Sequence, residues 1–211
     1  MHTGWRHAGG ATALALAVAI ALAASTLAAQ DAGRRDRTPA KPQTRPHAAR
    51  VAVDPATVSV EDGDTVVVRW PNDDVETVRI LGIDAPETRN PEHDLPYAQP
   101  FGDEARAFAH GAFLASRRIE LLRAAMLDPY GRTLGYFFLD GENYSVLIVR
   151  ARLAEETLSR FGDNGLPREA AEVSAAARAA GPLAFESPGA FRARMREVSR
   201  WMKGRGIYPV H

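Results

Sequence analysis

The chain has 211 residues, 45% of them hydrophobic and 25% charged, so it is long enough to bury one good core and to carry a tail. Basic and acidic side chains both total 26, but residues 1–50 hold seven basic and two acidic ones, which leaves 19 and 24 in residues 51–211. The absence of cysteine excludes a disulfide framework and a lipid-attachment cysteine.

Residues 1–29 have the pattern of a secretory signal peptide. Arg6 supplies a positive charge, a stretch of about 14 apolar residues follows, and small residues precede a cleavage region near Ala28 and Ala29. A membrane anchor is the alternative reading, but the stretch is shorter than the roughly 20 residues that span a bilayer. The sequence therefore predicts a secreted or periplasmic protein with no membrane segment after cleavage.

Residues 30–50 are rich in Pro, Arg and Gln and have no apolar periodicity, which predicts a disordered basic linker. Whether this linker contacts nucleic acid stays open. Residues 51–211 are then the folded domain, in which residues 162–211 form an extended C-terminal helical segment. We expect a monomer, although no feature of the sequence determines the oligomeric state.

The first half of the domain alternates β-branched runs with turn residues. Such runs predict strands at about 57–60, 65–70 and 76–83, followed by a proline-rich loop at 86–100. The elements predicted next are a helix at 101–114, strands at 117–122 and 133–140, and a short helix at 144–156 with Asn143 as a cap.

The last predicted helix, residues 191–203, is amphipathic. Its apolar face is formed by Phe191, Met195, Val198 and Met202, which we expect to pack on the core. Its arginine-rich outer face is interpreted as a solvated surface rather than a binding site. Five short strands with inserted and appended helices predict an α+β, mainly β fold, a five-stranded, partly open OB-fold barrel with three or more helices.

Charged and polar residues at three turns are the candidates for chemistry: Asp62 and Asp64, then Arg79, Asp84 and Glu87, then Asp128, Tyr130 and Arg132. Each turn alone is ordinary turn sequence. Two carboxylates with a backbone carbonyl also suit Ca²⁺, with water completing its shell. A cation beside guanidinium groups and a further carboxylate describes phosphodiester hydrolysis, because these groups neutralise the phosphate and orient the attacking water.

Five ordered motifs carry a family resemblance: "DGDT", "VRILGIDAPET", "PYAQPFGDEARAF", "DPYGRTLGYFFLDG" and "LIVRARLA". In order and spacing they resemble the staphylococcal nuclease-like (thermonuclease) family from about Val58 to Ala154. The resemblance resumes weakly at the final helix, where "KGRGIYP" is similar to the family's closing segment. It implies a five-stranded barrel with three helices, and Ca²⁺-dependent cleavage of DNA and RNA that leaves 3′-phosphate ends.

The resemblance also implies roles for single residues. Asp64 and Asp84 match the Ca²⁺ carboxylates, and Ala85, where the family usually has threonine, would serve through its backbone carbonyl. Glu87 matches the glutamate that acts on the attacking water as a general base or an orienting group. The remaining matches are Arg79 and Arg132, the two phosphate-binding arginines, and Tyr130, a candidate for substrate binding.

Several departures from the family weaken the expectation of tight binding to a polyanion. Pro129 and the acidic loop at 92–94 stand where lysines are expected, and Leu158 and Arg160 replace two nucleotide-packing tyrosines. A non-catalytic module on the same barrel, which binds nucleic acid or protein, is therefore the alternative. A protein whose C-terminal segment binds a partner is a third reading. The complete set of catalytic residues favours the nuclease.

Overall fold

The structure is a computed structural model and describes residues 41–71 and 73–209. The predicted signal peptide at 1–29 and residues 30–40 of the predicted linker lie outside the described residues. In the part of the chain that the structure describes, no helix is both long and apolar enough to cross a membrane.

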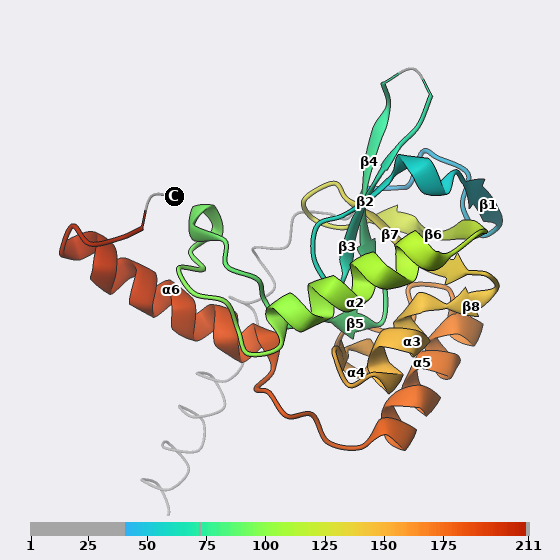
Figure 1. Cartoon of the computed structure of the whole chain (residues 1–211). Coiled ribbons are helices and arrows are strands. Elements are labelled where there is room, and N and C mark those ends of the chain that lie inside the picture. The colour runs from blue at the N-terminus through green and yellow to red at the C-terminus, as the bar shows by residue number, and fades with distance from the viewer. Residues whose placement is uncertain (1–40, 72, 210–211) are drawn as a thin grey trace, which may run out of the picture. The chain divides into compact units, whose positions relative to one another are not determined.

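A mainly antiparallel sheet curls into a partly open barrel (Figure 1). Its strands, in order across the sheet, are β1 (Arg50–Val53), β6 (Ile119–Leu127), β7 (Thr133–Leu139), β4 (Val75–Ile80), β3 (Thr65–Arg69) and β2 (Val58–Val60), with β8 (Glu142–Asn143) beside β7. The pair of β4 with β7 is parallel, whereas the other pairs are antiparallel. This sheet with its appended helices confirms the predicted OB-fold architecture.

The third predicted strand, residues 76–83, is interrupted by a turn. Gly82 has a φ of +80°, a left-handed conformation that glycine adopts without the cost of a side chain. The chain therefore leaves the barrel after β4 and forms β5 (Ile83–Asp84), which pairs with β9 (Glu155–Glu156). Because β9 takes up the end of the helix predicted at 144–156, that helix is shorter than predicted.

Residues 41–49, which the sequence assigns to the linker, are part of the folded domain. The Gln43 backbone N–H donates to the Ala125 carbonyl at 2.9 Å, and the Gln43 side chain donates to Thr133 Oγ1 at 3.1 Å. This segment is held by backbone hydrogen bonds and one buried amide, so apolar periodicity could not reveal it. The domain therefore begins before residue 51.

Helices cover the barrel and close its core. They are α2 (Gly102–Ala115), α3 (Tyr144–Arg150), the single turn α4 (Leu158–Phe161) and α5 (Pro167–Ala180), with 3₁₀ turns η1 (Pro55–Thr57) and η2 (Pro91–His93). The Asn143 side chain accepts a hydrogen bond from the Ser145 N–H at 3.0 Å, which confirms the predicted cap. Val173 and Ala176 of α5 are buried in the main core, so this part of the predicted C-terminal helical segment completes the barrel domain.

One buried ion pair lies in the barrel wall. Arg123 donates from Nε and Nη2 to the two oxygens of Glu76, both at 2.7 Å, and the two side chains are only 3% and 2% exposed. Thr133 and Trp70 donate to the same carboxylate at 2.6 and 2.7 Å. Burial by itself would raise the pKa of Glu76, but these hydrogen bonds outweigh it and lower the pKa below the ordinary value.

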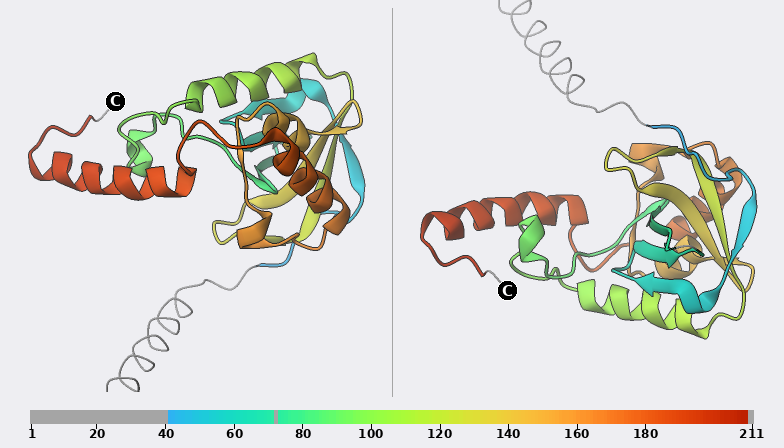
Figure 2. Two further views of the ribbon diagram at one scale, coloured as in Figure 1. Left: turned by 90° about the horizontal axis from the view of Figure 1, so that it is seen from below. Right: turned by 90° about the horizontal axis from the view of Figure 1, so that it is seen from above.

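The last helix, α6 (Pro188–Gly204), does not pack on the barrel core as the sequence predicted. Its buried residues Phe191 and Met195 form a separate cluster with Leu95 of the proline-rich loop. Figures 1 and 2 show α6 extending away from the barrel with this loop beside it. The periodicity of the helix correctly indicated a buried face, but could not tell which partner buries it.

Candidate functional site

Asp64 and Asp84 are brought together by the close approach of two small residues. A Cβ atom on Gly63 would lie 2.6 Å from the Cβ of Ala85, closer than side chains can pack. Ala85 N–H donates to Asp64 Oδ2 at 2.6 Å, so the turn after β5 is tied to the Asp64 carboxylate. The glycine of the "DGDT" motif is therefore needed to seat the two aspartates side by side.

Arg79 bridges the two aspartates from the neighbouring strand. It lies opposite Thr65 in the β3–β4 pair, which directs its guanidinium toward Asp64 at the start of β3. Its Nη2 donates to Asp84 Oδ1 at 2.8 Å, and its Nη1 pairs with Asp64. The two carboxylates are only 8% and 4% exposed, so the guanidinium offsets the cost of burying their charge. Burial lowers the pKa of Arg79, while the charge of Asp84 opposes that shift.

Glu87 is positioned through its backbone. Its N–H donates to Gln99 Oε1 at 3.2 Å, and its carbonyl accepts from the Gln99 N–H at 2.8 Å. A Cβ atom on Gly102, the first residue of α2, would lie 2.2 Å from the Glu87 carbonyl oxygen, so a glycine is required there. The Glu87 side chain is 18% exposed. Burial raises its pKa, and the hydrogen bond from Arg192 acts in the opposite direction.

Arg192 of α6 is a member of the site that the sequence did not predict. Its Nη2 donates to Asp84 Oδ2 at 2.8 Å, and its Nη1 donates to Asp84 Oδ1 at 3.1 Å and to Glu87 Oε1. Burial by itself would lower the pKa of Arg192, but these carboxylates raise it. Residues 105 positions apart meet in this contact, and no local pattern or motif spacing could have found it.

Arg132, the second predicted phosphate-binding arginine, is held beside the cluster rather than in it. Its Nε donates to Asp128 Oδ2 at 2.7 Å, and its guanidinium lies 5.6 Å from the centre of the Tyr130 ring. Tyr130 itself is 86% exposed. The positive charge of Arg132 is close enough to contribute to the lowered pKa of Arg79. The structure therefore places Arg132 near the carboxylates but paired with Asp128.

The predicted metal ligands fit a hard cation. Asp64, Asp84 and the Ala85 carbonyl offer only oxygen donors, which Ca²⁺ prefers at six to eight positions. Both carboxylates are nearly buried and are paired with guanidinium groups, so positive charge is stabilised at this place in the fold. Residues 41–71 and 73–209 contain no group of three or more His, Cys, Asp or Glu side chains arranged to hold a metal. Water would therefore have to complete the coordination shell.

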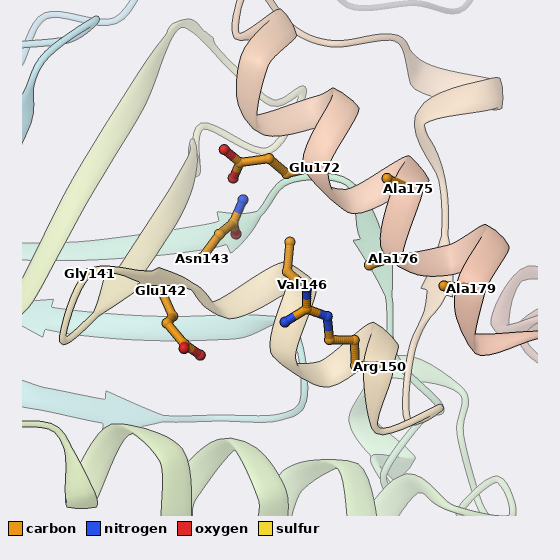
Figure 3. Close-up of a pocket in the computed structure, with 9 residues that line it drawn as sticks. All are labelled: Gly141, Glu142, Asn143, Val146, Arg150, Glu172, Ala175, Ala176 and Ala179. Carbon is orange, nitrogen blue, oxygen red and sulfur yellow. The ribbon is translucent and has the colours of Figure 1, made fainter.

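A pocket lies apart from these residues, between α3 and α5 (Figure 3). Its lining combines alanines of α5 with the charged side chains Glu142, Arg150 and Glu172 and the amide of Asn143. None of the predicted site residues contributes to it. The pocket is therefore not part of the carboxylate site.

Residues 77–181 match the protein family described as staphylococcal nuclease homologue. The chain belongs to the staphylococcal nuclease-like family. It is 38% identical over 96 residues to a thermonuclease of Staphylococcus intermedius, an alignment that covers 45% of this chain and 54% of that protein. It is 34% identical over 94 residues to the SPbeta prophage-derived endonuclease YokF of Bacillus subtilis, covering 44% and 30% of the two chains.

Endonuclease YncB of Bacillus subtilis is 32% identical over 94 residues, covering 44% of this chain and 43% of that protein. The chain thus spans about half or less of the length of these relatives. The staphylococcal nuclease match includes Arg79, Asp84 and Glu87, and it runs on through α5. It ends before α6, so Arg192 is contributed by a helix outside the matched segment.

Proposed function

We propose that this chain is an exported, Ca²⁺-dependent phosphodiesterase that cleaves DNA, RNA or both as an endonuclease and leaves 3′-phosphate ends. The observation that supports this best is a continuous ion-pair cluster, in which Arg79 joins Asp64 to Asp84 and Arg192 joins Asp84 to Glu87. Oxygen ligands for a hard metal ion, a guanidinium that can bind phosphate and a carboxylate that can act on water therefore lie together. Family membership and the nuclease names of the relatives support the same class of reaction.

The reaction adds water to phosphorus and breaks its bond to the 5′ oxygen. The phosphate stays on the 3′ side, and the 5′ oxygen leaves as a hydroxyl. Glu87 would orient the attacking water and take up its proton. Arg79 would bind the non-bridging oxygens and stabilise the charge that develops on them, joined by Arg132 once it leaves Asp128. Ca²⁺ held by Asp64, Asp84 and the Ala85 carbonyl would supply further positive charge beside those oxygens.

The test is hydrolysis of single-stranded DNA and RNA by the full chain in Ca²⁺, in Mg²⁺ and in chelator. Arg79→Ala and Glu87→Gln should each lower the Ca²⁺-dependent rate by about 10²–10³-fold, the usual effect of removing a group that stabilises a transition state. Arg69→Ala and Glu142→Gln are matched controls, because both side chains are exposed and lie outside the site. Equal rates in the site variants and the controls would contradict the proposal.

The alternative, a non-catalytic module that binds nucleic acid or protein, has one observation in its favour. Asp84 and Glu87 already share a guanidinium partner, Arg192, so these carboxylates are neutralised without a metal. A module of this kind would bind oligonucleotides or a protein but leave them intact in every metal. Product analysis in the same assay separates the two readings.

Export and monomeric state are also proposals. Cleavage of the signal peptide should shorten the chain by about 29 residues, in line with the small-residue site that the sequence predicts. Expression in a bacterium, followed by fractionation and mass measurement of the chain, tests this. Light scattering of the purified chain tests the monomer.

A further inference from the structure

Positive charge is concentrated at the C-terminal end of the domain. Residues 188–209 hold six Lys or Arg and one Glu, whereas residues 41–187 hold 16 basic and 23 acidic side chains. The family match ends at residue 181, so this basic segment lies outside the matched residues. A barrel with an excess of seven acidic groups repels a polyanion, whereas α6 is the described element on which positive charge is concentrated.

The start of α6 is fixed at the carboxylates. Arg192 pairs with Asp84 and Glu87, and the Gln99 side chain donates to the carbonyl of Glu186 at 2.7 Å while its other end holds the Glu87 backbone. From this point the helix extends away from the barrel (Figure 2). A polyanion bound along α6 would therefore lead directly to the candidate active site.

Three arginines of α6 follow one stripe of the helix. Arg192, Arg196 and Arg200 are four residues apart, so each step advances about 6 Å along the axis. Arg196 and Arg200 are exposed, and within the described residues neither forms an ion pair. Trp201 lies next to this stripe, 55% exposed, with the Arg205 guanidinium 4.8 Å from its ring centre.

We propose that α6 is a binding arm for single-stranded polynucleotide, an inference that rests on the proposed nuclease function for its substrate class. The arginine stripe binds successive phosphates, and Trp201 provides a surface on which a base stacks. Every base has an aromatic face, so such an arm binds without strong sequence preference. Arg192 marks the end of the stripe at which the bound strand reaches the carboxylates.

An anionic membrane is the other polyanion that a basic amphipathic helix can bind, and the packing of α6 argues against it. Membrane-surface helices insert an apolar face between the lipids. The apolar face of α6 is already buried, because Phe191 and Met195 pack on Leu95 and Met202 is only 7% exposed. What α6 presents to solvent is charge and one aromatic ring, which suits nucleic acid.

The test is binding of a fluorescently labelled 12-nucleotide single strand to the full chain, measured by anisotropy in chelator over a range of salt concentrations. Arg196→Ala/Arg200→Ala should weaken binding about tenfold, the loss expected for two exposed ion pairs. It should also reduce the slope of log affinity against log salt by about 1.4, because each phosphate contact contributes about 0.7 for single strands. Arg168→Ala/Arg178→Ala on α5 removes the same charge from exposed positions, and its affinity should stay within about twofold of the parent chain.

The oligonucleotide should quench tryptophan fluorescence in the parent chain, and this quenching should be lost in Trp201→Phe. Retained quenching would contradict the stacking of a base on Trp201. Equal affinity and slope in the two double variants, or no binding by the parent chain at low salt, would overturn the inference. The inference would also be overturned if Arg196→Ala/Arg200→Ala lost binding to phosphatidylserine vesicles while its binding to the oligonucleotide was unchanged. Binding is measured in chelator, which prevents metal-dependent cleavage, so it is tested separately from activity. A protein that binds the oligonucleotide through α6 but cleaves it in no metal would refute the proposed function without contradicting the binding arm.

Discussion

Removing Arg192 should tighten the binding of a divalent cation to the site. In the structure this guanidinium holds both oxygens of Asp84, at 2.8 and 3.1 Å, and also contacts Glu87. A metal ion that uses Asp84 must take at least one of these oxygens from Arg192 and must tolerate its positive charge. Arg192→Ala removes both obstacles, while Arg79 continues to hold Asp64 and Asp84 in place.

The expected size follows from the contacts that are lost. A hydrogen bond between charged groups contributes about 1.5–3 kcal/mol net, and Arg192 makes two of them to Asp84. The side chain is 35% exposed, so solvent screening reduces each of the two bonds to about 1 kcal/mol. A total of about 2 kcal/mol corresponds to roughly a 30-fold lower Kd for Ca²⁺. Arg192→Lys keeps the charge but cannot donate two parallel hydrogen bonds, so its Kd for Ca²⁺ should lie between those of the parent chain and Arg192→Ala.

The assay is calorimetric titration of Ca²⁺ into the metal-free full chain, which needs no substrate. Arg196→Ala, one helical turn further along α6, is the control for loss of a basic side chain from this helix. Circular dichroism verifies that each variant is folded. If Arg192→Ala binds Ca²⁺ with unchanged or lower affinity, then Arg192 organises the ligands instead of competing for them, and the reasoning is wrong.

Three further outcomes are expected. Gly63→Val should abolish Ca²⁺ binding in calorimetry, because its side chain would collide with Ala85, whereas Gly111→Ala, where nothing lies within 4 Å, should leave it unchanged. Glu76→Gln should cost about 3–5 kcal/mol in urea unfolding, because it leaves the buried Arg123 without a counter-charge. The contribution of Glu76 to the stability of the parent chain should be fully present above pH about 4.5, the ordinary pKa of glutamate. It should fall as the pH drops toward the lowered pKa of Glu76 in the folded state, and the variant should lose this part of the acid dependence.

The sequence could predict the centre of the site because its residues are local in the chain. Asp64 directly precedes β3 and Arg79 lies on β4, its partner in the hairpin, and Asp84 follows only five residues after Arg79. Strand alternation and turn chemistry determine such neighbours. The small residues Gly63 and Ala85, which allow the approach, were also visible in the motifs.

The rest of the site depends on contacts that local patterns do not encode. Arg192 lies beside Phe191 in an amphipathic helix, and periodicity shows only that Phe191 is buried, not that the next side chain reaches a carboxylate 105 residues earlier. Arg132 and Asp128 are only four residues apart, yet the sequence did not show whether Arg132 is free to bind phosphate or is paired with the Asp128 carboxylate. Which partner an arginine takes is decided by competition between them in the folded chain.

Charge balance connects the site with the arm. Asp64, Asp84 and Glu87 face two guanidinium groups, those of Arg79 and Arg192, so the cluster carries one net negative charge without a metal. A divalent cation would change that sign to positive, and under the proposed function a phosphate then becomes attractive at the place where it was repelled. Cation and substrate would accordingly bind in a coupled manner, each strengthening the other. An acidic barrel with a basic helix can work in this way, because α6 retains the strand at a distance while the bound cation draws one phosphate into the site.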